Sequence, residues 1–124
     1  MASLIDERTK AILINNPSNP CGSNFSQEHL VAIANLARLN NLPIIADEIY
    51  GGCVFNGTFT PMFTLSGDVP IISLGGLAKE FIVPGWRMGW ITLHDSTNVR
   101  FNEIRTGLKN LSQLILGNNL KITG

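Results

Sequence analysis

Short apolar runs flank one longer amphipathic segment in the first half of the chain. Residues 9–14 and residues 43–46 are almost continuously apolar, which predicts two buried strands. Between them, residues 26–40 repeat apolar side chains at helical spacing, which predicts a helix with a buried face of Leu30, Ile33, Ala34 and Ala37. Ser26 is expected to cap this helix, and the turn-forming residues 15–22 to end the first strand. This order of elements is typical of a parallel sheet.

The second half of the chain predicts two further strands and a second helix. The strands are expected at residues 71–74 and 90–93, with an irregular loop over residues 50–69. The helix is expected to begin after residues 95–97, with an apolar stripe of Phe101, Ile104, Leu108, Leu111 and Ile115. We therefore predict an α/β fold with a mostly parallel sheet flanked by helices. These few elements cannot cover both faces of such a sheet, which favours part of a larger domain.

The composition is that of a globular protein. The chain has 124 residues, of which 44% are hydrophobic and 15% charged, so extended disorder is excluded. Its formal net charge of +0 argues against a nucleic-acid partner. No apolar run approaches the roughly 18 residues of a membrane helix, and residues 1–8 lack the apolar core of a secretion signal. We expect a cytoplasmic protein without a membrane partner, and the mitochondrion stays open as an alternative.

Several polar residues are expected to have structural roles only. Cys21 and Cys53 have no CxxC spacing and too few companions for a zinc site or a disulfide framework, so no metal is expected. We expect Cys21 to be a small buried residue and His94 to lie in a loop. Ser73, near a strand end, could contact a phosphate, but it is expected to hydrogen-bond the backbone instead.

Lys79 and Arg87 are the first residues that indicate chemistry. Lys79 ends the glycine-rich segment Gly75-Gly76-Leu77-Ala78-Lys79, which is expected to form a turn directly after a strand. A lysine amine that has lost its proton can add to a carbonyl group and hold it covalently. Arg87, eight positions later, has a planar and permanently charged side chain that suits a phosphate group. Together they favour covalent capture of an aldehyde beside a bound phosphate.

Asp47, Tyr50 and Asn19 add the groups that an aromatic aldehyde cofactor needs. Asp47 can pair with a protonated pyridine nitrogen, since two unit charges about 4 Å apart attract by roughly 4 kcal/mol at an effective dielectric constant of about 20. Tyr50 and Asn19 can both donate a hydrogen bond to a ring oxygen. The carboxyl ends of adjacent parallel strands are where α/β proteins bind ligands. With Lys79 and Arg87, these residues predict a site for pyridoxal 5'-phosphate.

Each of these residues also has a structural interpretation. A lone lysine or arginine is ordinarily a solvated surface charge, and an acid after a strand commonly caps a helix or lies at the surface. An asparagine between prolines is most often a turn residue, and a tyrosine is most often a core or rim aromatic. Only the joint order and spacing favours the functional interpretation, for Asn19, Asp47, Tyr50, Lys79 and Arg87.

Four segments carry motifs of a known family: Asn16-Pro17-Ser18-Asn19-Pro20-Cys21-Gly22, Asp47-Glu48-Ile49-Tyr50, Gly75-Gly76-Leu77-Ala78-Lys79, and residues 83–90. They resemble the class I/II aminotransferases of pyridoxal-phosphate fold type I, especially the tyrosine-type branch, and the likeness runs from about residue 4 to residue 117. The resemblance implies that Lys79 is the Schiff-base lysine, which also carries the substrate α-proton. Asp47 is then the partner of the pyridine nitrogen, and Arg87 binds the phosphate. Tyr50 and Asn19 are the two donors to the ring 3-hydroxyl oxygen.

The resemblance also implies an activity and an assembly. The expected reaction is transamination of an aromatic amino acid, L-tyrosine with 2-oxoglutarate giving 4-hydroxyphenylpyruvate and glutamate, in a full-length homodimer. Residues 1–124 are expected to be an incomplete large pyridoxal-phosphate-binding domain, without the N-terminal part and the small C-terminal domain, and inactive in isolation. Gly76 stands where many relatives carry a phosphate-binding serine, so phosphate binding depends more on Arg87.

Two other functions remain open. A fold-type-I pyridoxal-phosphate enzyme of another kind, a C–S lyase or a synthase, would use the same cofactor groups for a different reaction. A non-catalytic truncated product would retain the motifs without activity. Formation of the keto acid from tyrosine distinguishes the aminotransferase from both.

Overall fold

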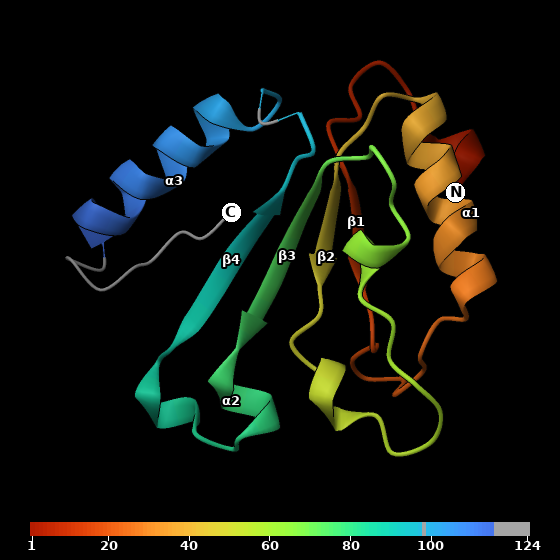
Figure 1. The fold of residues 1–124 in the computed structure, drawn as a ribbon. Helices are drawn as coiled ribbons and strands as arrows, with labels where there is room; N and C mark the ends of the chain where they lie inside the picture. Colours follow the sequence, from red (N-terminus) through yellow and green to blue (C-terminus); the bar gives the residue numbers. More distant parts are fainter. Residues whose placement is uncertain (98, 116–124) are drawn as a thin grey trace.

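A four-stranded sheet forms the centre of the molecule, with the strands in the order β1-β2-β3-β4 (Figure 1). The computed structural model describes residues 1–97 and 99–115. Its strands are β1 (Ile12–Asn15), β2 (Ile44–Asp47), β3 (Ile71–Gly76) and β4 (Gly89–His94). The first three are parallel, and β4 runs antiparallel to β3. The predicted α/β fold with a mostly parallel sheet is confirmed, although β1 begins at residue 12 rather than residue 9.

Helices precede, connect and follow the strands along the described residues. They are α1 (Gln27–Leu39), α2 (Leu77–Glu80) and α3 (Asn102–Ile115), with the short 3-10 helices η1 (Ala2–Leu4), η2 (Gly51–Cys53), η3 (Met62–Thr64) and η4 (Pro84–Trp86). The prediction of a wholly irregular loop over residues 50–69 is wrong, because η2 and η3 lie within it. Each is a single turn closed by local backbone hydrogen bonds, which hydrophobic periodicity does not reveal. No helix in the described part of the chain is long and apolar enough to cross a membrane.

Helix α1 forms as the sequence predicts and covers one face of the sheet. The Ser26 hydroxyl accepts a hydrogen bond from the backbone N–H of His29 at 3.3 Å, which satisfies a donor of the first turn. Asn40 caps the other end, and Asn41 has a left-handed φ of 53° that turns the chain away. The predicted buried face is confirmed and packs against sheet residues in one cluster with Ile12, Ile14, Ile44, Ala46 and Ile71.

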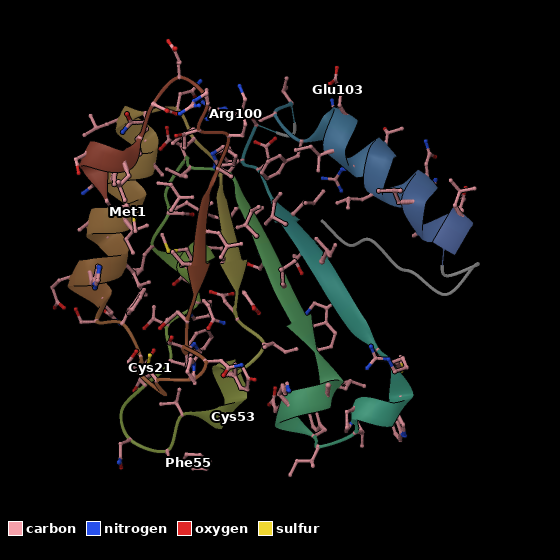
Figure 2. The ribbon with its side chains drawn as sticks, turned by 180° about the vertical axis from the view of Figure 1, so that it is seen from behind. Met1, Cys21, Cys53, Phe55, Arg100 and Glu103 are labelled. Carbon is pink, nitrogen blue, oxygen red and sulfur yellow. The ribbon has the colours of Figure 1, made fainter. Side chains whose placement is uncertain are left out.

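The opposite face of the sheet is less covered by the described residues. Side chains alternate between the faces of a strand, so Leu13, Ile45 and Ile72 point away from α1. Leu13 is 66% exposed. Helix α3 lies beside β4, at the end of the sheet remote from β1 and α1, in both views (Figures 1 and 2). Chain segments converge at the carboxyl ends of the strands, where α/β proteins bind ligands.

Strand β3 is longer than predicted, since Gly75 and Gly76 belong to it rather than to a turn. They pair with Trp90 and Gly89 in the antiparallel ladder. A Cβ atom on Gly75 would collide with the indole ring of Trp90, which lies across this position on the same face. The glycine therefore allows close approach of a large side chain, and the prediction of a glycine turn is wrong for this reason.

Helix α3 begins later than predicted because Asp95 organises the connection before it. Its Oδ1 accepts from the Thr97 N–H at 3.1 Å and its Oδ2 from the Phe101 N–H at 3.2 Å. Of the predicted stripe, Phe101 is buried, whereas Ile104 and Leu111 are 39% and 53% exposed. The side chain of Ile115 lies outside those that the structure describes.

Two polar residues lie in surroundings other than those predicted. His94 is the last residue of β4 rather than a loop residue, and its ring stacks on Phe63 with the ring centroids 4.3 Å apart. Cys21 is exposed rather than buried, because it lies at the tip of the turn after β1. Neither position follows from the local sequence, since both depend on how separate segments pack.

We expect Gly75→Ala to lower the free energy of unfolding by about 1–3 kcal/mol, because the added methyl group displaces the Trp90 indole. Gly85→Ala is the matched control: no atom lies within 4 Å of the position of its Cβ, so a change within about 0.5 kcal/mol is expected. Denaturant unfolding of the two purified variants measures the difference. Equal losses in both would contradict the close packing of Trp90 on Gly75.

Candidate active site

The ends of β1 and β2 bring Asn15 and Asp47 side by side. The two residues are paired in the parallel register, and the Asn15 amide donates to Oδ2 of Asp47 at 3.3 Å. The other oxygen, Oδ1, accepts from the backbone N–H of Ile49 at 3.4 Å. The Asp47 carboxylate is thus part-buried and oriented by two donors. Asn15 was not among the predicted site residues, although its place at the end of the neighbouring strand is a signal for it.

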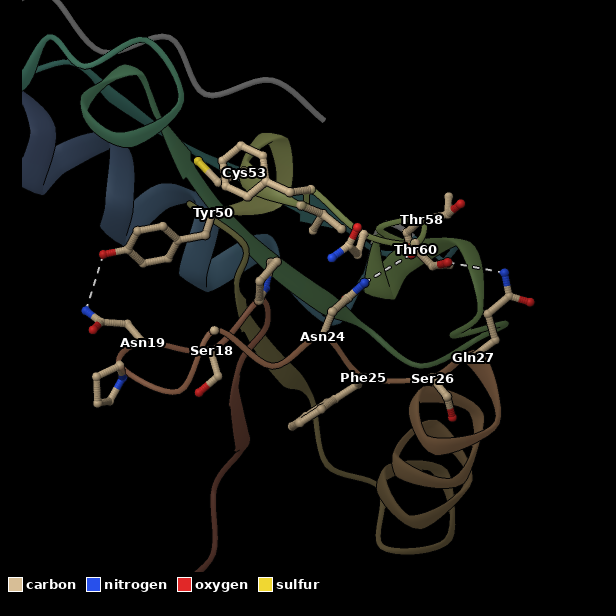
Figure 3. Close-up of a pocket in the computed structure, with 17 residues that line it drawn as sticks. Ser18, Asn19, Asn24, Phe25, Ser26, Gln27, Tyr50, Cys53, Thr58 and Thr60 are labelled. Carbon is tan, nitrogen blue, oxygen red and sulfur yellow. Dashed lines mark hydrogen bonds between the residues drawn. The ribbon is translucent and has the colours of Figure 1, made fainter.

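Asn19 and Tyr50 meet through their side chains, as Figure 3 shows. The Asn19 amide donates to the Tyr50 hydroxyl oxygen at 3.2 Å. The backbone N–H of Asn19 in turn donates to Oδ1 of Asn15 at 2.7 Å, which ties the turn back to the end of β1. Two residues that are 31 positions apart are therefore brought together by adjacent strand ends.

Lys79 joins this group from the third parallel strand. It lies on α2, directly after β3, and its Nζ is 5.7 Å from the centroid of the Tyr50 ring. A cation at this distance from an aromatic face is attracted by the ring quadrupole. The Lys79 residue is exposed, so its amine is accessible to a ligand. The structure thus connects Asn19, Tyr50 and Lys79.

Arg87 lies apart from the others. It follows η4, has a left-handed φ of 51°, and its Nη1 donates to the backbone oxygen of Pro84 at 3.2 Å. In the described part of the chain, no hydrogen bond or ion pair links its guanidinium to the other predicted site residues. The side chain is an exposed charge near the turn that follows Lys79.

A cavity of about 750 Å³ adjoins Asn19 and Tyr50. It lies between the segment of residues 17–27 and the segment of residues 50–60, which are linked by hydrogen bonds from Asn24 to Thr58 and from Gln27 to Thr60 (Figure 3). Its lining is uncharged and combines polar groups with apolar ones, including Phe25, Cys53, Val54 and Phe55. Figure 2 shows Cys21, Cys53 and Phe55 together at this end of the molecule. Among the described residues, no group of three or more His, Cys, Asp or Glu side chains could hold a metal ion.

Glu48 ties the end of β2 to the start of η3, a role that the sequence did not indicate. Its Oε1 accepts from the backbone N–H of Met62 at 2.6 Å, and burial raises the pKa of its carboxyl group more than this hydrogen bond lowers it. Ser73 lies beside it in a second cavity of about 380 Å³. The Ser73 hydroxyl is buried without a hydrogen-bond partner among the described residues, so the expectation that it bonds the backbone is wrong.

Residues 1–120 match the family described as aminotransferase class I and II. The chain belongs to this family. Tyrosine aminotransferase of Bos taurus is 58% identical over 118 residues, which are 94% of this chain and 26% of that protein. The chain thus spans about a quarter of the length of the curated relatives.

Solved structures of aminotransferases share the fold of this chain. Tyrosine aminotransferase from Leishmania infantum matches with a TM-score of 0.84 and 43% identity, over 94% of this chain and 31% of that one. Alanine aminotransferase from Pyrococcus furiosus matches with a TM-score of 0.86 and 34% identity, over 90% of this chain and 28% of that one. The predicted resemblance and the predicted class of enzyme are therefore confirmed. The roles of the individual site residues stay predictions.

Burial of Glu48 gives a prediction about the pH dependence of stability. Because its pKa is raised above the ordinary value of 4.5, the folded protein favours the neutral carboxyl. The corresponding stabilisation is fully present below that value and is lost as the pH rises through the raised pKa. Glu48→Gln keeps an oxygen for the Met62 N–H but cannot ionise. We expect its Tm to exceed that of the wild type by an amount that grows from about pH 4 to about pH 8.

Thermal unfolding across this pH range measures the effect, with Glu28→Gln as the control. Hydrogen bonds from its own backbone and from Ser26 lower the pKa of Glu28, so its ionised form stabilises the fold. Glu28→Gln should therefore lose Tm relative to the wild type as the pH rises, which is the opposite sign. A difference between Glu48→Gln and the wild type that does not change with pH would contradict the proposed burial.

Proposed function

We propose that this chain is the cofactor-binding part of an aminotransferase that uses pyridoxal 5'-phosphate to transfer the amino group of L-tyrosine to 2-oxoglutarate. The observation that carries the proposal is the contact series from Asn19 through Tyr50 to Lys79, beside the oriented carboxylate of Asp47. Residues from three strand ends converge there, as a ligand site in an α/β fold requires. The products would be 4-hydroxyphenylpyruvate and glutamate.

The residues present fit the groups of this cofactor. The amide of Asn19 and the hydroxyl of Tyr50 lie 3.2 Å apart, and both have protons to donate to a phenolic ring oxygen. Asp47 offers a carboxylate to a protonated pyridine nitrogen, and Lys79 offers an exposed amine to the aldehyde. When bound, the cofactor supplies an electron-accepting ring that stabilises negative charge at the substrate α-carbon.

The side chains of this chain then have separate tasks. Lys79 would hold the aldehyde end of the cofactor through Nζ, and the same amine, when free, would be the general base and acid that moves the substrate α-proton. Asp47 keeps the proton on the pyridine nitrogen by its negative charge. Arg87 binds the phosphate: a guanidinium has five N–H donors, and Pro84 accepts from one of its nitrogens.

Tyrosine is proposed because curated relatives that are 57–58% identical to this chain are tyrosine aminotransferases. The cavity beside Asn19 and Tyr50 is uncharged and partly aromatic, which suits an apolar substrate portion better than an acidic one. A C–S lyase or a synthase of the same fold type is the second candidate, because it would need the same cofactor-holding residues.

We expect Lys79→Ala in the full-length protein to abolish the visible absorbance of covalently bound pyridoxal phosphate and to lower transamination at least about a hundredfold, the usual share of a general acid–base group. Lys109→Ala removes an exposed lysine of α3 and is the matched control. Absorbance spectra and a coupled keto-acid assay measure both variants. Retention of the absorbance in Lys79→Ala would refute the assignment of this lysine.

The reaction itself gives a second test. We expect full-length protein to form 4-hydroxyphenylpyruvate from tyrosine only when 2-oxoglutarate is added, with glutamate formed in equal amount. Residues 1–124 alone should not turn over tyrosine. Chromatography of the products from tyrosine and, in parallel, from a thioether amino acid distinguishes the candidates, since a C–S lyase breaks the carbon–sulfur bond of the latter and releases a thiol, ammonia and a keto acid without an amino acceptor. Ammonia release independent of 2-oxoglutarate would favour the second candidate.

A further inference from the structure

Asn15 lies between two residues that are proposed to hold the cofactor. Its Nδ2 donates to Oδ2 of Asp47 at 3.3 Å, and its Oδ1 accepts from the backbone N–H of Asn19 at 2.7 Å. One planar amide therefore uses its donor on one site residue and its acceptor on the other. We propose that Asn15 is a positioning residue, which holds the Asp47 carboxylate and the Asn19 turn in fixed relation for pyridoxal phosphate. The proposal rests on the proposed function.

The sheet fixes the backbone on which this amide acts. Asn15 pairs with Asp47 at the last position of the β1–β2 ladder, and the next backbone N–H, of Asn16, donates to the Asp47 carbonyl oxygen at 3.1 Å. Nδ2 of Asn15 also lies 3.5 Å from that carbonyl oxygen. With the two backbones held by the ladder, only the side-chain torsions remain free. Two hydrogen bonds on opposite ends of the amide fix these torsions.

The position of Asn19 depends on the same amide. Asn19 is exposed, in a turn outside the regular structure, and its backbone N–H bonds to Oδ1 of Asn15. Its side chain then reaches the hydroxyl of Tyr50 at 3.2 Å, over whose ring Lys79 lies. Loss of the Asn15 acceptor would release the turn. The Asn19 amide and the Tyr50 hydroxyl would then be less well aligned as the two proposed donors to the ring oxygen of the cofactor.

Variants at Asn15 can separate its two hydrogen bonds. Asn15→Leu has a similar size and removes both. Asn15→Asp keeps an acceptor for the Asn19 N–H, loses the donor to Asp47, and places a second negative charge beside that carboxylate. The exchanged pair Asn15→Asp with Asp47→Asn restores an amide–carboxylate hydrogen bond but moves the negative charge to β1. Asn40→Ala is the control, because it removes an amide-to-backbone hydrogen bond of 2.8 Å at the end of α1.

The test uses the full-length protein and three measurements: Tm without cofactor, Kd for pyridoxal 5'-phosphate, and the pH titration of the visible absorbance of the bound cofactor. We expect Asn15→Leu to weaken Kd by about tenfold or more, as for loss of a hydrogen bond to a charged group. Asn15→Asp should weaken Kd and shift the midpoint of the absorbance titration. The exchanged pair should regain the Tm that Asn15→Asp loses relative to the wild type. Its absorbance titration should stay different from that of the wild type, because the negative charge now lies on β1. Asn40→Ala should lower Tm and leave Kd and the titration unchanged.

A purely structural role predicts a different pattern. If Asn15→Leu and Asn15→Asp lose Tm as Asn40→Ala does but keep the wild-type Kd and titration midpoint, the positioning role is overturned and the proposed function stands. If the wild type binds no pyridoxal phosphate, the proposed function fails first, and the role of Asn15 fails with it.

Discussion

The register of the three parallel strands determines where polar side chains of this molecule can meet. Ile12, Ile44 and Ile71 pair across β1, β2 and β3, so the strands end at nearly the same level. Asn15 and Asp47 therefore lie side by side on the face away from α1. A slip of one residue would turn one of them toward the apolar core, where an unpaired carboxylate or amide costs several kcal/mol, roughly 2–7 for a neutral polar group.

Buried side chains hold the segments that leave this edge. Asn16 is 1% exposed, and its Oδ1 accepts from the backbone N–H of Phe25 at 2.8 Å, which closes the turn after β1. Glu48 does the same after β2 by accepting from the N–H of Met62. Each loop begins directly after a strand, and the hydrogen bond to Phe25 or to Met62 fixes the point where that loop ends. The two loops can then form the walls of the uncharged cavity without regular structure of their own.

Local patterns were sufficient for much of the fold. The apolar spacing and the Ser26 cap predicted α1, and the proline-glycine turn predicted the strand that begins near Trp90. Contacts between segments were not predictable in this way: Gly75 belongs to β3 because it pairs with Trp90 of β4, and its missing side chain leaves room for the indole ring. Likewise, the packing that leaves the Ser73 hydroxyl buried without a hydrogen-bond partner among the described residues brings together separate segments, so no local pattern predicts it.

In the candidate site, too, local motifs predicted the residues, but not all the contacts between them. The motifs named Asn19, Asp47, Tyr50 and Lys79, and the structure connects three of them directly through side chains. The fourth, Asp47, joins through Asn15, a link that depends on strand register and on a side-chain torsion. Neither quantity can be read from one sequence: the place of Asn15 at a strand end signals that it lies near the site, but not which residues its side chain contacts.

The turn between α2 and β4 shows how the backbone places Arg87. Ile82 and Arg87 have left-handed φ angles of 55° and 51°, which are uncommon for L-residues and most of all for a β-branched one. Such conformations cost about 1–3 kcal/mol each and persist only where the surroundings enforce them. The antiparallel ladder does so here, because Leu77 N–H donates to the Met88 oxygen at 3.2 Å and closes the base of the turn. A lysine on one side of this turn and an arginine on the other are thus held by main-chain geometry, which suits a ligand with an aldehyde and a phosphate on one ring.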